Sequence, residues 1–392
     1  MAVEEVQGAD VLAPADPGEA AEAVKASRVV VPRGGGTKWG LVAARMASVA
    51  GTPGGLRIVD TTRLAGILQY DPAEYTVTVL AGTRLDDLGQ VLQRAGQYLP
   101  FDPPLVARGA TAGGAVASGL GGPGRLRRGG VRDFVLGIRF VDGEGRLVRA
   151  GGKVVKNAAG FDLPKLFCGS LGELGVLVEV TFKVLPAPPS SGTARFGFDR
   201  LPDAAAALRR LLRTPLEPDA VDLVERRALQ AASGPEVAAD DPWSLWVRVS
   251  GEEAHVAARL DRVEAAVGAP GARLHGPPEQ ALWEVLRDLE WASRAPAVLR
   301  LHTTPGRIER LDEALQRLGA LRHYSVAGHV AWAAMDSVPA RSLLVSELAG
   351  LADAALALRG AQGSPHVLMP GEGFARRVKR ALDPAGRFGW TW

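Results

Sequence analysis

Glycine clusters dominate the first half of this 392-residue chain. The stretch from Gly109 to Gly175 holds eighteen of the forty-eight glycines, and a triplet at 34–36 follows a short apolar run. Glycine loses more backbone freedom on folding than any other residue, so such clusters carry an energetic cost. That cost is offset where the backbone itself must approach another group closely, as around a phosphate. The clusters therefore favour a phosphate-bearing cofactor in the first half of the chain.

Composition bounds the class of protein. A chain of this length predicts two domains, and 47% hydrophobic with 23% charged residues is typical of a soluble globular protein. No window approaches 18 uninterrupted apolar residues, which predicts no membrane span. The acidic first 22 residues do not resemble a secretory signal. The net charge of +3, without a basic stripe and interleaved aromatics, gives no indication of a nucleic-acid partner.

Cys168 is the only cysteine. A single cysteine excludes an internal disulfide and favours a reducing compartment, so we expect a cytoplasmic protein. It also cannot build a zinc or iron–sulfur site by itself.

Period-two and β-branched runs predict strands before residue 190. They lie at 28–31, 56–59, 75–79, 135–141, 146–149 and 175–184. Thr83 is expected to cap a helix, since leucines at 85, 88 and 92 follow at helical spacing. The Asp-Gly-Glu-Gly sequence at 142–145 predicts a hairpin turn.

The Pro/Ser/Gly cluster at 186–192 predicts a domain boundary. Strand patterns beyond it alternate with amphipathic helices; the strands are expected at 194–198, 245–249, 297–302 and 329–334. This rhythm predicts an α+β domain with helices on one face of an antiparallel sheet. A short basic helix is expected in the tail, 371–387.

Each glycine motif alone has two interpretations. Successive N–H groups of the 32–38 loop could form an anion-binding nest, or the loop could be a plain tight turn. The small residues at 111–119 could pack against a ring or diphosphate, or simply fill a close-packed core. The Gly-x-x-Gly-x-x-Gly run at 169–175 precedes a strand and not a helix, which disfavours a nicotinamide fold.

The order of these motifs is more specific than any one of them. The chain resembles the vanillyl-alcohol-oxidase/PCMH-type FAD-binding family, through the segments PRGGGTKWG (32–40), ATAGGAVASGLGGPGR (110–125), GGVRDFVLG (129–137), the run 151–186, and DPAGRF (383–388). Within that family the KNAAGFDLPKLFCGS run is most similar to the small FAD-binding subunit of glycolate oxidase (glycolate dehydrogenase). The resemblance covers residues 20–190 and the tail, and it is thin across 190–360.

The resemblance implies a two-domain PCMH-type α+β fold. Residues 1–187, completed by the tail 365–392, would bind FAD, and residues 193–360 would form an α+β, ferredoxin-like cap. The residues implied to contact FAD are Arg33, Gly34, Gly35, Gly36, Thr37, Lys38, Thr111, Gly113, Gly114, Ser118, Val131, Arg132, Asp133, Phe161, Asp162, Glu173, Gly175 and Val176. Relatives often tether the flavin through a histidine, but this chain has none before His255. Non-covalent FAD is therefore expected.

Hydroxy-acid oxidation needs a cation for the substrate carboxylate and a base for its hydroxyl proton. Arg300 and His302 lie two apart on a predicted strand and share a face, so they are the candidate cation and base. The alternative is an ordinary solvated strand face. Related dehydrogenases carry a His-x-Gly-Asp-Gly-Asn-type metal motif that this chain lacks, so no metal is expected.

The implied function is that of an FAD-binding subunit in a 2-hydroxy acid dehydrogenase complex. A second flavoprotein and an iron–sulfur subunit would be its partners, electrons would not pass to nicotinamide, and any membrane association would come through those partners. Two alternatives remain open: a self-sufficient FAD-dependent 2-hydroxy acid dehydrogenase, and a cofactor-free scaffold subunit.

Overall fold

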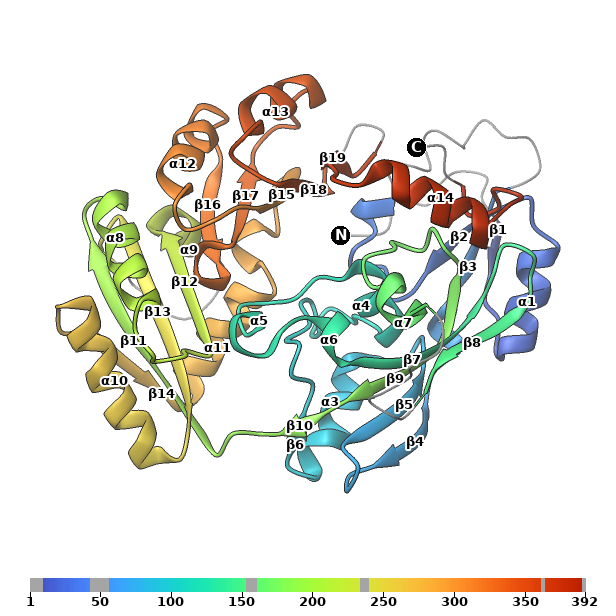
Figure 1. The fold of residues 1–392 in the computed structure, drawn as a ribbon, viewed down its shortest axis with the longest axis horizontal. Helices are drawn as coiled ribbons and strands as arrows, with labels where there is room; N and C mark the ends of the chain where they lie inside the picture. The colour runs from blue at the N-terminus through green and yellow to red at the C-terminus, as the bar shows by residue number, and fades with distance from the viewer. Residues whose placement is uncertain (1–9, 43–55, 153–160, 233–239, 361–363, 390–392) are drawn as a thin grey trace. The chain divides into compact units, whose positions relative to one another are not determined.

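The computed structural model describes residues 10–42, 56–152, 161–232, 240–360 and 364–389 (Figure 1). Residues 153–160 of the run that carries part of the family resemblance, and the last residues, Trp390–Trp392, lie outside them. The chain forms two compact units, and it passes between them four times. The first unit comprises described residues within 1–120, 130–187 and 371–392, and the second comprises 121–129 and 188–370.

The first unit contains a small parallel sheet in the order β1-β3-β2. Its strands are β1 (Asp10–Leu12), β2 (Val29–Arg33) and β3 (Leu56–Asp60). Helix α1 (Pro17–Lys25) begins at Asp16, whose carboxylate accepts from the N–H groups of Gly18 and Glu19. The buried face of α1 packs with β2 and β3 in one apolar cluster, as the valine-rich strand sequences predict.

A five-stranded antiparallel sheet forms the rest of the unit's framework, in the order β4-β5-β9-β7-β8. Its strands are β4 (Ile67–Asp71), β5 (Thr76–Leu80), β7 (Val135–Val141), β8 (Leu147–Gly151) and β9 (Val176–Lys183). The expected hairpin joins β7 to β8, because the Asp142 carboxylate accepts from the N–H groups of Glu144 and Arg146. Strands β6 (Gln97–Tyr98) and β10 (Leu185–Pro186) pair separately.

The other helices among the described residues of the first unit are also short. They are α3 (Leu85–Arg94), α4 (Ala112–Ser118), α6 (Val131–Phe134), α7 (Leu163–Phe167) and α14 (Glu372–Leu382), with a 3₁₀ turn η1 (Thr61–Arg63). The prediction that Thr83 caps α3 is wrong, because the N-cap residue is Arg84, whose side chain makes no capping hydrogen bond. Thr83 instead bonds both the N–H and the carbonyl of Gly66, because the loop before β4 passes beside it.

The second unit is built on one nine-stranded sheet whose neighbours are all antiparallel, in the order β14-β11-β13-β12-β16-β17-β15-β18-β19. Its strands are β11 (Ser190–Phe198), β12 (Ala220–Glu225), β13 (Trp243–Gly251), β14 (Ala272–His275), β15 (Ala297–His302), β16 (Leu321–Ser325), β17 (Val330–Met335), β18 (Ala354–Arg359) and β19 (His366–Leu368). The predicted boundary cluster therefore ends inside a strand, since β11 already begins at Ser190.

The nine-stranded sheet contains the same β-α-β-β-α-β arrangement twice. Strands β11 to β14 with helices α8 (Leu201–Leu212) and α10 (Glu253–Val267) form one half. Strands β15 to β18 with helices α12 (Ile308–Arg317) and α13 (Arg341–Leu348) form the other. Each half has the ferredoxin-like strand order, and the two join through β12 and β16, where Leu223 faces Tyr324.

Helices cover both faces of this sheet, although the sequence predicted one. Helices α8, α10, α12 and α13 contribute to a single large core on the first face. On the other, α11 (Gly276–Arg287) places Glu279 to accept from Ser191 and Thr193. The remaining elements of this unit are α5 (Arg125–Arg128), α9 (Arg226–Ala231), η2 (Glu290–Ala292) and η3 (Val326–Gly328).

Helix α5 comes from a segment that the sequence assigned to the first domain, 1–187. The structure places it in the second unit, where it contacts β12 and η3. Arg127 bonds the carboxylate and the carbonyl of Glu217, the latter at 3.0 Å, and Arg128 lies 3.9 Å from Asp219. These contacts explain why the glycine-flanked segment 121–129 leaves the first unit and returns.

A buried ionic network supports the helix-covered core of the second unit. Arg322 lies 2.9 Å from Asp312 and 3.3 Å from Glu225, with all three side chains at most 9% exposed. The Tyr324 hydroxyl donates to Asp312 at 2.8 Å.

Among the described residues, the helices lack the combination of length and apolar character that a membrane-spanning helix requires.

Candidate functional site

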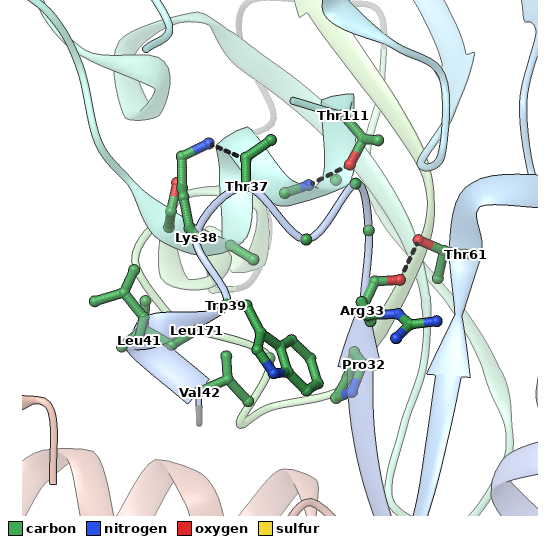
Figure 2. Close-up of a pocket in the computed structure, with 18 of the residues that line it drawn as sticks. Pro32, Arg33, Thr37, Lys38, Trp39, Leu41, Val42, Thr61, Thr111 and Leu171 are labelled. Atoms are coloured by element: carbon green, nitrogen blue, oxygen red, sulfur yellow. Dashed lines mark hydrogen bonds between the residues drawn. The ribbon is translucent and has the colours of Figure 1, made fainter. Parts of the chain in front are cut away.

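The glycine loop lies where two parallel strands end. Strands β2 and β3 are in register, with Arg33 beside Asp60, so the loop after β2 lies next to Thr61. The Arg33 guanidinium donates twice to one Asp60 oxygen, at 2.6 and 3.0 Å, and lies over the Trp39 ring. The Thr61 hydroxyl donates to the carbonyl of Arg33 at 3.1 Å, as Figure 2 shows. Both strand ends therefore hold the start of the loop.

Asp60 is a charged anchor of this loop. Burial alone would raise the pKa of its carboxyl group, but hydrogen bonds from the Thr62 hydroxyl and N–H, together with Arg33, lower it. The Arg33 side chain is thus engaged within the protein. Two of its nitrogen atoms, Nε and Nη2, are taken up by Asp60, so this guanidinium serves first to hold the loop.

The loop has no room for side chains where it packs against the segment 109–111. A Cβ on Gly35 would lie 1.9 Å from the carbonyl oxygen of Gly109, and one on Gly34 would meet the Thr111 hydroxyl. Gly113 of α4 is equally confined, because its Cβ would lie 2.8 Å from that of Ala81. Close backbone packing, and not flexibility, accounts for these glycines.

The glycine loop lines a pocket, and the described residues leave several of its backbone donors without an acceptor. Among the described residues, none accepts a hydrogen bond from the N–H groups of Gly34, Gly35, Gly36 or Thr37. The pocket encloses about 730 Å³ of empty space, which includes open solvent at its mouth. It is lined by Pro32, Arg33, Gly34, Gly35, Gly36, Thr37, Lys38, Trp39, Leu41, Val42, Thr61, Thr111, Gly113, Gly114, Ala117, Ser118, Leu171, Gly172, Gly175 and Leu177. Figure 2 shows the loop curving around this space.

A tight turn at 171–175 forms a further wall. Leu171 and Gly172 both have positive φ, at 53° and 81°. A Cβ on Gly172 would lie 3.2 Å from the Pro32 ring, so this turn packs directly against the end of β2. The turn and the 33–38 loop are therefore neighbours across the pocket.

The structure brings eleven of the predicted cofactor residues to this pocket. They are Arg33, Gly34, Gly35, Gly36, Thr37, Lys38, Thr111, Gly113, Gly114, Ser118 and Gly175. The pocket lining does not include the other seven, which are Val131, Arg132, Asp133, Phe161, Asp162, Glu173 and Val176.

These seven residues have local roles. Asp133 accepts from the N–H of Gly130 at the start of α6, and Asp162 accepts from the N–H of Lys165 at the start of α7. Val131 and Val176 are buried in apolar clusters. Phe161 is 94% exposed, and Arg132 is also exposed. Glu173 is buried, and its carbonyl accepts from Lys379.

Several pocket residues were missed by sequence reasoning. Thr61 follows the predicted strand 56–59, and a parallel pairing with 28–31 would have placed it beside the loop. Leu171 and Gly172 lie inside a recognised glycine run. Trp39, Leu41 and Val42 had no signal, because an apolar residue in a loop does not indicate which surface it covers.

Arg300 and His302 lie on β15 and do touch each other, as their spacing predicts. Arg300 Nη1 is 2.5 Å from His302 Nε2. Arg300 is 6% exposed, and its Nε and Nη2 atoms have no partner among the described residues. It also lies over the ring of Trp332 on the neighbouring strand β17. Burial, with a contribution from Arg125, lowers the pKa of Arg300 to about 10, so it remains charged near pH 7.

The contacts of His302 do not support its predicted role as a base. Arg300 has only donors, so Nε2 of His302 must accept, and its lone pair is already used. Burial, then the charges of Arg300 and Arg125, lower the pKa of His302 to about 4. A proton on this imidazole would stand beside a buried cation. His302 instead fixes one edge of the Arg300 guanidinium.

Cys168 is not a reactive thiol. Its Sγ donates to the carbonyl of Pro164 at 3.4 Å, and burial raises its pKa to about 12. Within the described part of the chain, no three His, Cys, Asp or Glu side chains gather as a metal site would require.

Comparison with known proteins assigns both units. Residues 9–151 match the FAD binding domain family, and residues 187–341 match the C-terminal domain of FAD linked oxidases. FAD is therefore the cofactor. The free amides and the glycines packed on 109–114 suit its pyrophosphate, which needs donors and a backbone without side chains.

Relatives of known name are similar over part of the chain. The glycolate oxidase subunit GlcE of Escherichia coli is 51% identical over 130 residues, which are 33% of this chain and 37% of GlcE. D-lactate dehydrogenase of Anaerostipes hadrus is 33% identical over 45% of this chain and 37% of its own length. The glycolate oxidase subunit GlcD of Bacillus subtilis is 30% identical over 51% of this chain and 41% of GlcD. Each match thus spans well under two thirds of the relative.

The fold itself extends over nearly the whole chain. A solved alkyldihydroxyacetonephosphate synthase superposes with a TM-score of 0.73 at 18% identity, covering 96% of this chain and 76% of the other. The expected two-domain α+β architecture is confirmed by this likeness and by the two family matches. The chain thus carries an FAD binding domain over residues 9–151 and a C-terminal domain of FAD linked oxidases over residues 187–341.

Proposed function

We propose that this chain is the FAD-binding subunit of a glycolate (2-hydroxy acid) dehydrogenase complex. The complex oxidises a 2-hydroxy acid to a 2-oxo acid and passes electrons through flavin to an iron–sulfur partner. One observation carries the proposal: four N–H groups of the glycine loop, which lines the pocket, have no acceptor among the described residues, in a chain that shares 51% identity with GlcE over 130 residues.

The residues of the pocket have distinct roles in holding the cofactor. The N–H groups of 34–37 bind the pyrophosphate, and the small side chains of α4 allow its close approach. When bound, FAD accepts a hydride from the substrate carbon. The attachment is non-covalent, since the sequence has no histidine before His255 and the thiol of Cys168 is held in its protonated form.

Arg300 is the proposed anchor for the substrate carboxylate. His302 occupies Nη1, which leaves Nε and Nη2 free on the same edge of the guanidinium. This edge offers two parallel N–H groups, the geometry that a carboxylate accepts in bidentate fashion. A buried cation without a counter-ion is also unfavourable, so an anion there is stabilised. His302 orients the fork and does not take the proton.

A reconstitution experiment tests the proposal. The apoprotein is titrated with FAD, and the holoprotein is precipitated with acid; flavin bands with a colourless pellet are expected. Yellow colour in the pellet would contradict non-covalent binding. Absence of flavin bands would favour the cofactor-free scaffold. Purification of the tagged chain from native extract should then recover a second flavoprotein and iron; recovery of neither would overturn the complex.

The self-sufficient dehydrogenase is the second candidate, because a chain that binds FAD and carries the proposed carboxylate anchor Arg300 would need no second flavoprotein for its substrate. Glycolate or D-lactate is supplied to the purified holoprotein with an artificial electron acceptor. Robust turnover, lost in Arg300→Met and retained in the exposed control Arg294→Met, would establish that candidate. If the chain is a subunit, we expect no turnover by the purified chain alone and turnover once the partner subunits are added.

A further inference from the structure

The C-terminal segment (residues 372–388) contacts the supports of both pocket walls, although it lines no part of the pocket. It consists of α14 and the turn that follows it, in which Asp383 begins the DPAGRF sequence. Lys379 faces the interior at 5% exposure, and Phe388 is 2% exposed within the apolar cluster of α1, β2 and β3. The segment is therefore an integral part of the first unit (Figure 1).

One end of the segment holds the strand that leads into the glycine loop. The carbonyl of Arg387 accepts from the N–H of Val30 at 2.6 Å. Val30 lies in β2, three residues before Arg33. The Arg387 side chain also donates to the carbonyls of Lys25, at 3.2 Å, and of Ser27, at the end of α1. The C-terminal segment therefore holds the part of β2 that leads into the glycine loop.

The other end holds the 171–175 turn. Lys379 Nζ donates to the carbonyl of Glu173 at 2.7 Å, between Gly172 and Gly175, both of which line the pocket. Lys379 also lies 2.6 Å from Asp383, whose side chain is fully buried. The ammonium group of Lys379 therefore connects the turn to the side-chain carboxylate of Asp383.

Asp383 completes the connection. Its two oxygens accept from the N–H groups of Arg387, at 2.8 Å, and Phe388, at 2.9 Å. A continuous path of polar contacts then runs from the Glu173 carbonyl through Lys379 and Asp383 to the backbone at 387–388, and on to Val30. This path spans both walls of the pocket.

We propose that the Lys379–Asp383 pair fixes the separation of the two pocket walls and thereby sets the affinity for FAD. The inference rests on the proposal that this pocket holds the cofactor. A bound pyrophosphate needs donors within about 0.5 Å of their best distance, so a wall that can shift loses affinity. Lys379 and Asp383 are positioning residues, since neither lines the pocket.

The test uses the full-length chain and FAD fluorescence quenching. Lys379→Met/Asp383→Asn removes both charges together, which avoids leaving one buried charge unpaired. We expect its Kd for FAD to rise at least about 10-fold, mainly through faster dissociation, while apoprotein circular dichroism stays unchanged. Arg380→Met, an exposed change on the same helix, should bind FAD like the wild type.

Equal FAD affinity in the double variant and the wild type would overturn the inference. A merely structural pair would lower the melting temperature of apoprotein and holoprotein alike and leave Kd unchanged. If the double variant does not fold, hydrogen exchange of the wild type decides: FAD must slow exchange of amides in 372–388, because coupling is reciprocal. No such protection would refute the coupling. These measurements involve no substrate, so wild-type FAD binding without hydroxy-acid turnover would contradict only the proposed function.

Discussion

Replacing Gly35 by alanine should weaken FAD binding without unfolding the protein. The new Cβ would lie 1.9 Å from the carbonyl oxygen of Gly109, whereas real Cβ atoms are not found closer than 3.0 Å. The obstacle is backbone and cannot rotate away. The loop must therefore move by about 1 Å or more from the segment 109–111.

The size of the effect follows from the donors in this loop. N–H···O hydrogen bonds have a useful distance range of only about 0.5 Å, so such a movement breaks at least one bond to the pyrophosphate. A hydrogen bond to a charged group contributes about 1.5–3 kcal/mol. Loss of one bond thus raises the Kd for FAD by about 10- to 150-fold.

Isothermal titration of apoprotein with FAD measures this change. The matched control is Gly89→Ala, in the interior of α3 in the same unit, where an added Cβ meets nothing within 4 Å. Alanine there should stabilise the helix slightly, by up to about 1 kcal/mol, and leave FAD binding unchanged. A Gly35→Ala protein that binds FAD within twofold of the wild type would refute the role given to this loop.

Three further outcomes are expected. Arg322→Met leaves two buried carboxylates without their cation, so it should lower the free energy of unfolding measured in urea by about 3–5 kcal/mol. The control Arg317→Met, in an exposed ion pair, should lower it by about 1 kcal/mol or less. Equal losses in the two variants would contradict the role given to the buried network. Burial and then Arg300 lower the pKa of His302 from 6.5 to about 4. The contribution of this neutral histidine to the free energy of unfolding is therefore fully present above pH 6.5 and is lost as the pH falls toward 4. In His302→Gln the melting temperature should decline less over that range, and an unchanged decline would count against the assignment. Burial raises the pKa of Cys168 to about 12, so iodoacetamide at pH 8 should label it only in denaturant, and rapid labelling of the native chain would show a thiolate.

Local patterns predicted the elements that depend on local sequence. Strand β15 has the predicted bounds, 297–302, because a short, largely apolar run suits a strand that has neighbours on both sides. The glycine triplet 34–36 follows a strand, β2, as its position after an apolar run predicts, and it lines the pocket. The Thr83 cap was wrong because a distant loop, at Gly66, took its hydroxyl.

Features set by distant contacts were not predictable. The duplication of the ferredoxin-like motif was missed because β12 and β16, which join the halves, are short strands with no clear alternation. The resemblance implies that Phe161 and Asp162 lie near the flavin; neither lines the pocket, Phe161 is exposed and Asp162 caps α7, so their contact with FAD stays a prediction. The pairing of Lys379 with Glu173 and Asp383 joins residues up to 206 positions apart, and charge alone in a basic helix gives no sign of burial.

The repeated passage of the chain between its units constrains protein engineering. A chimera joined once, after Ala187, would pair a foreign second unit with the native loop 121–129, although that loop bonds Glu217 through Arg127. Grafts between relatives must therefore carry the loop together with 188–370. Recombination during evolution meets the same restriction, so these two stretches are expected to have been inherited as one block.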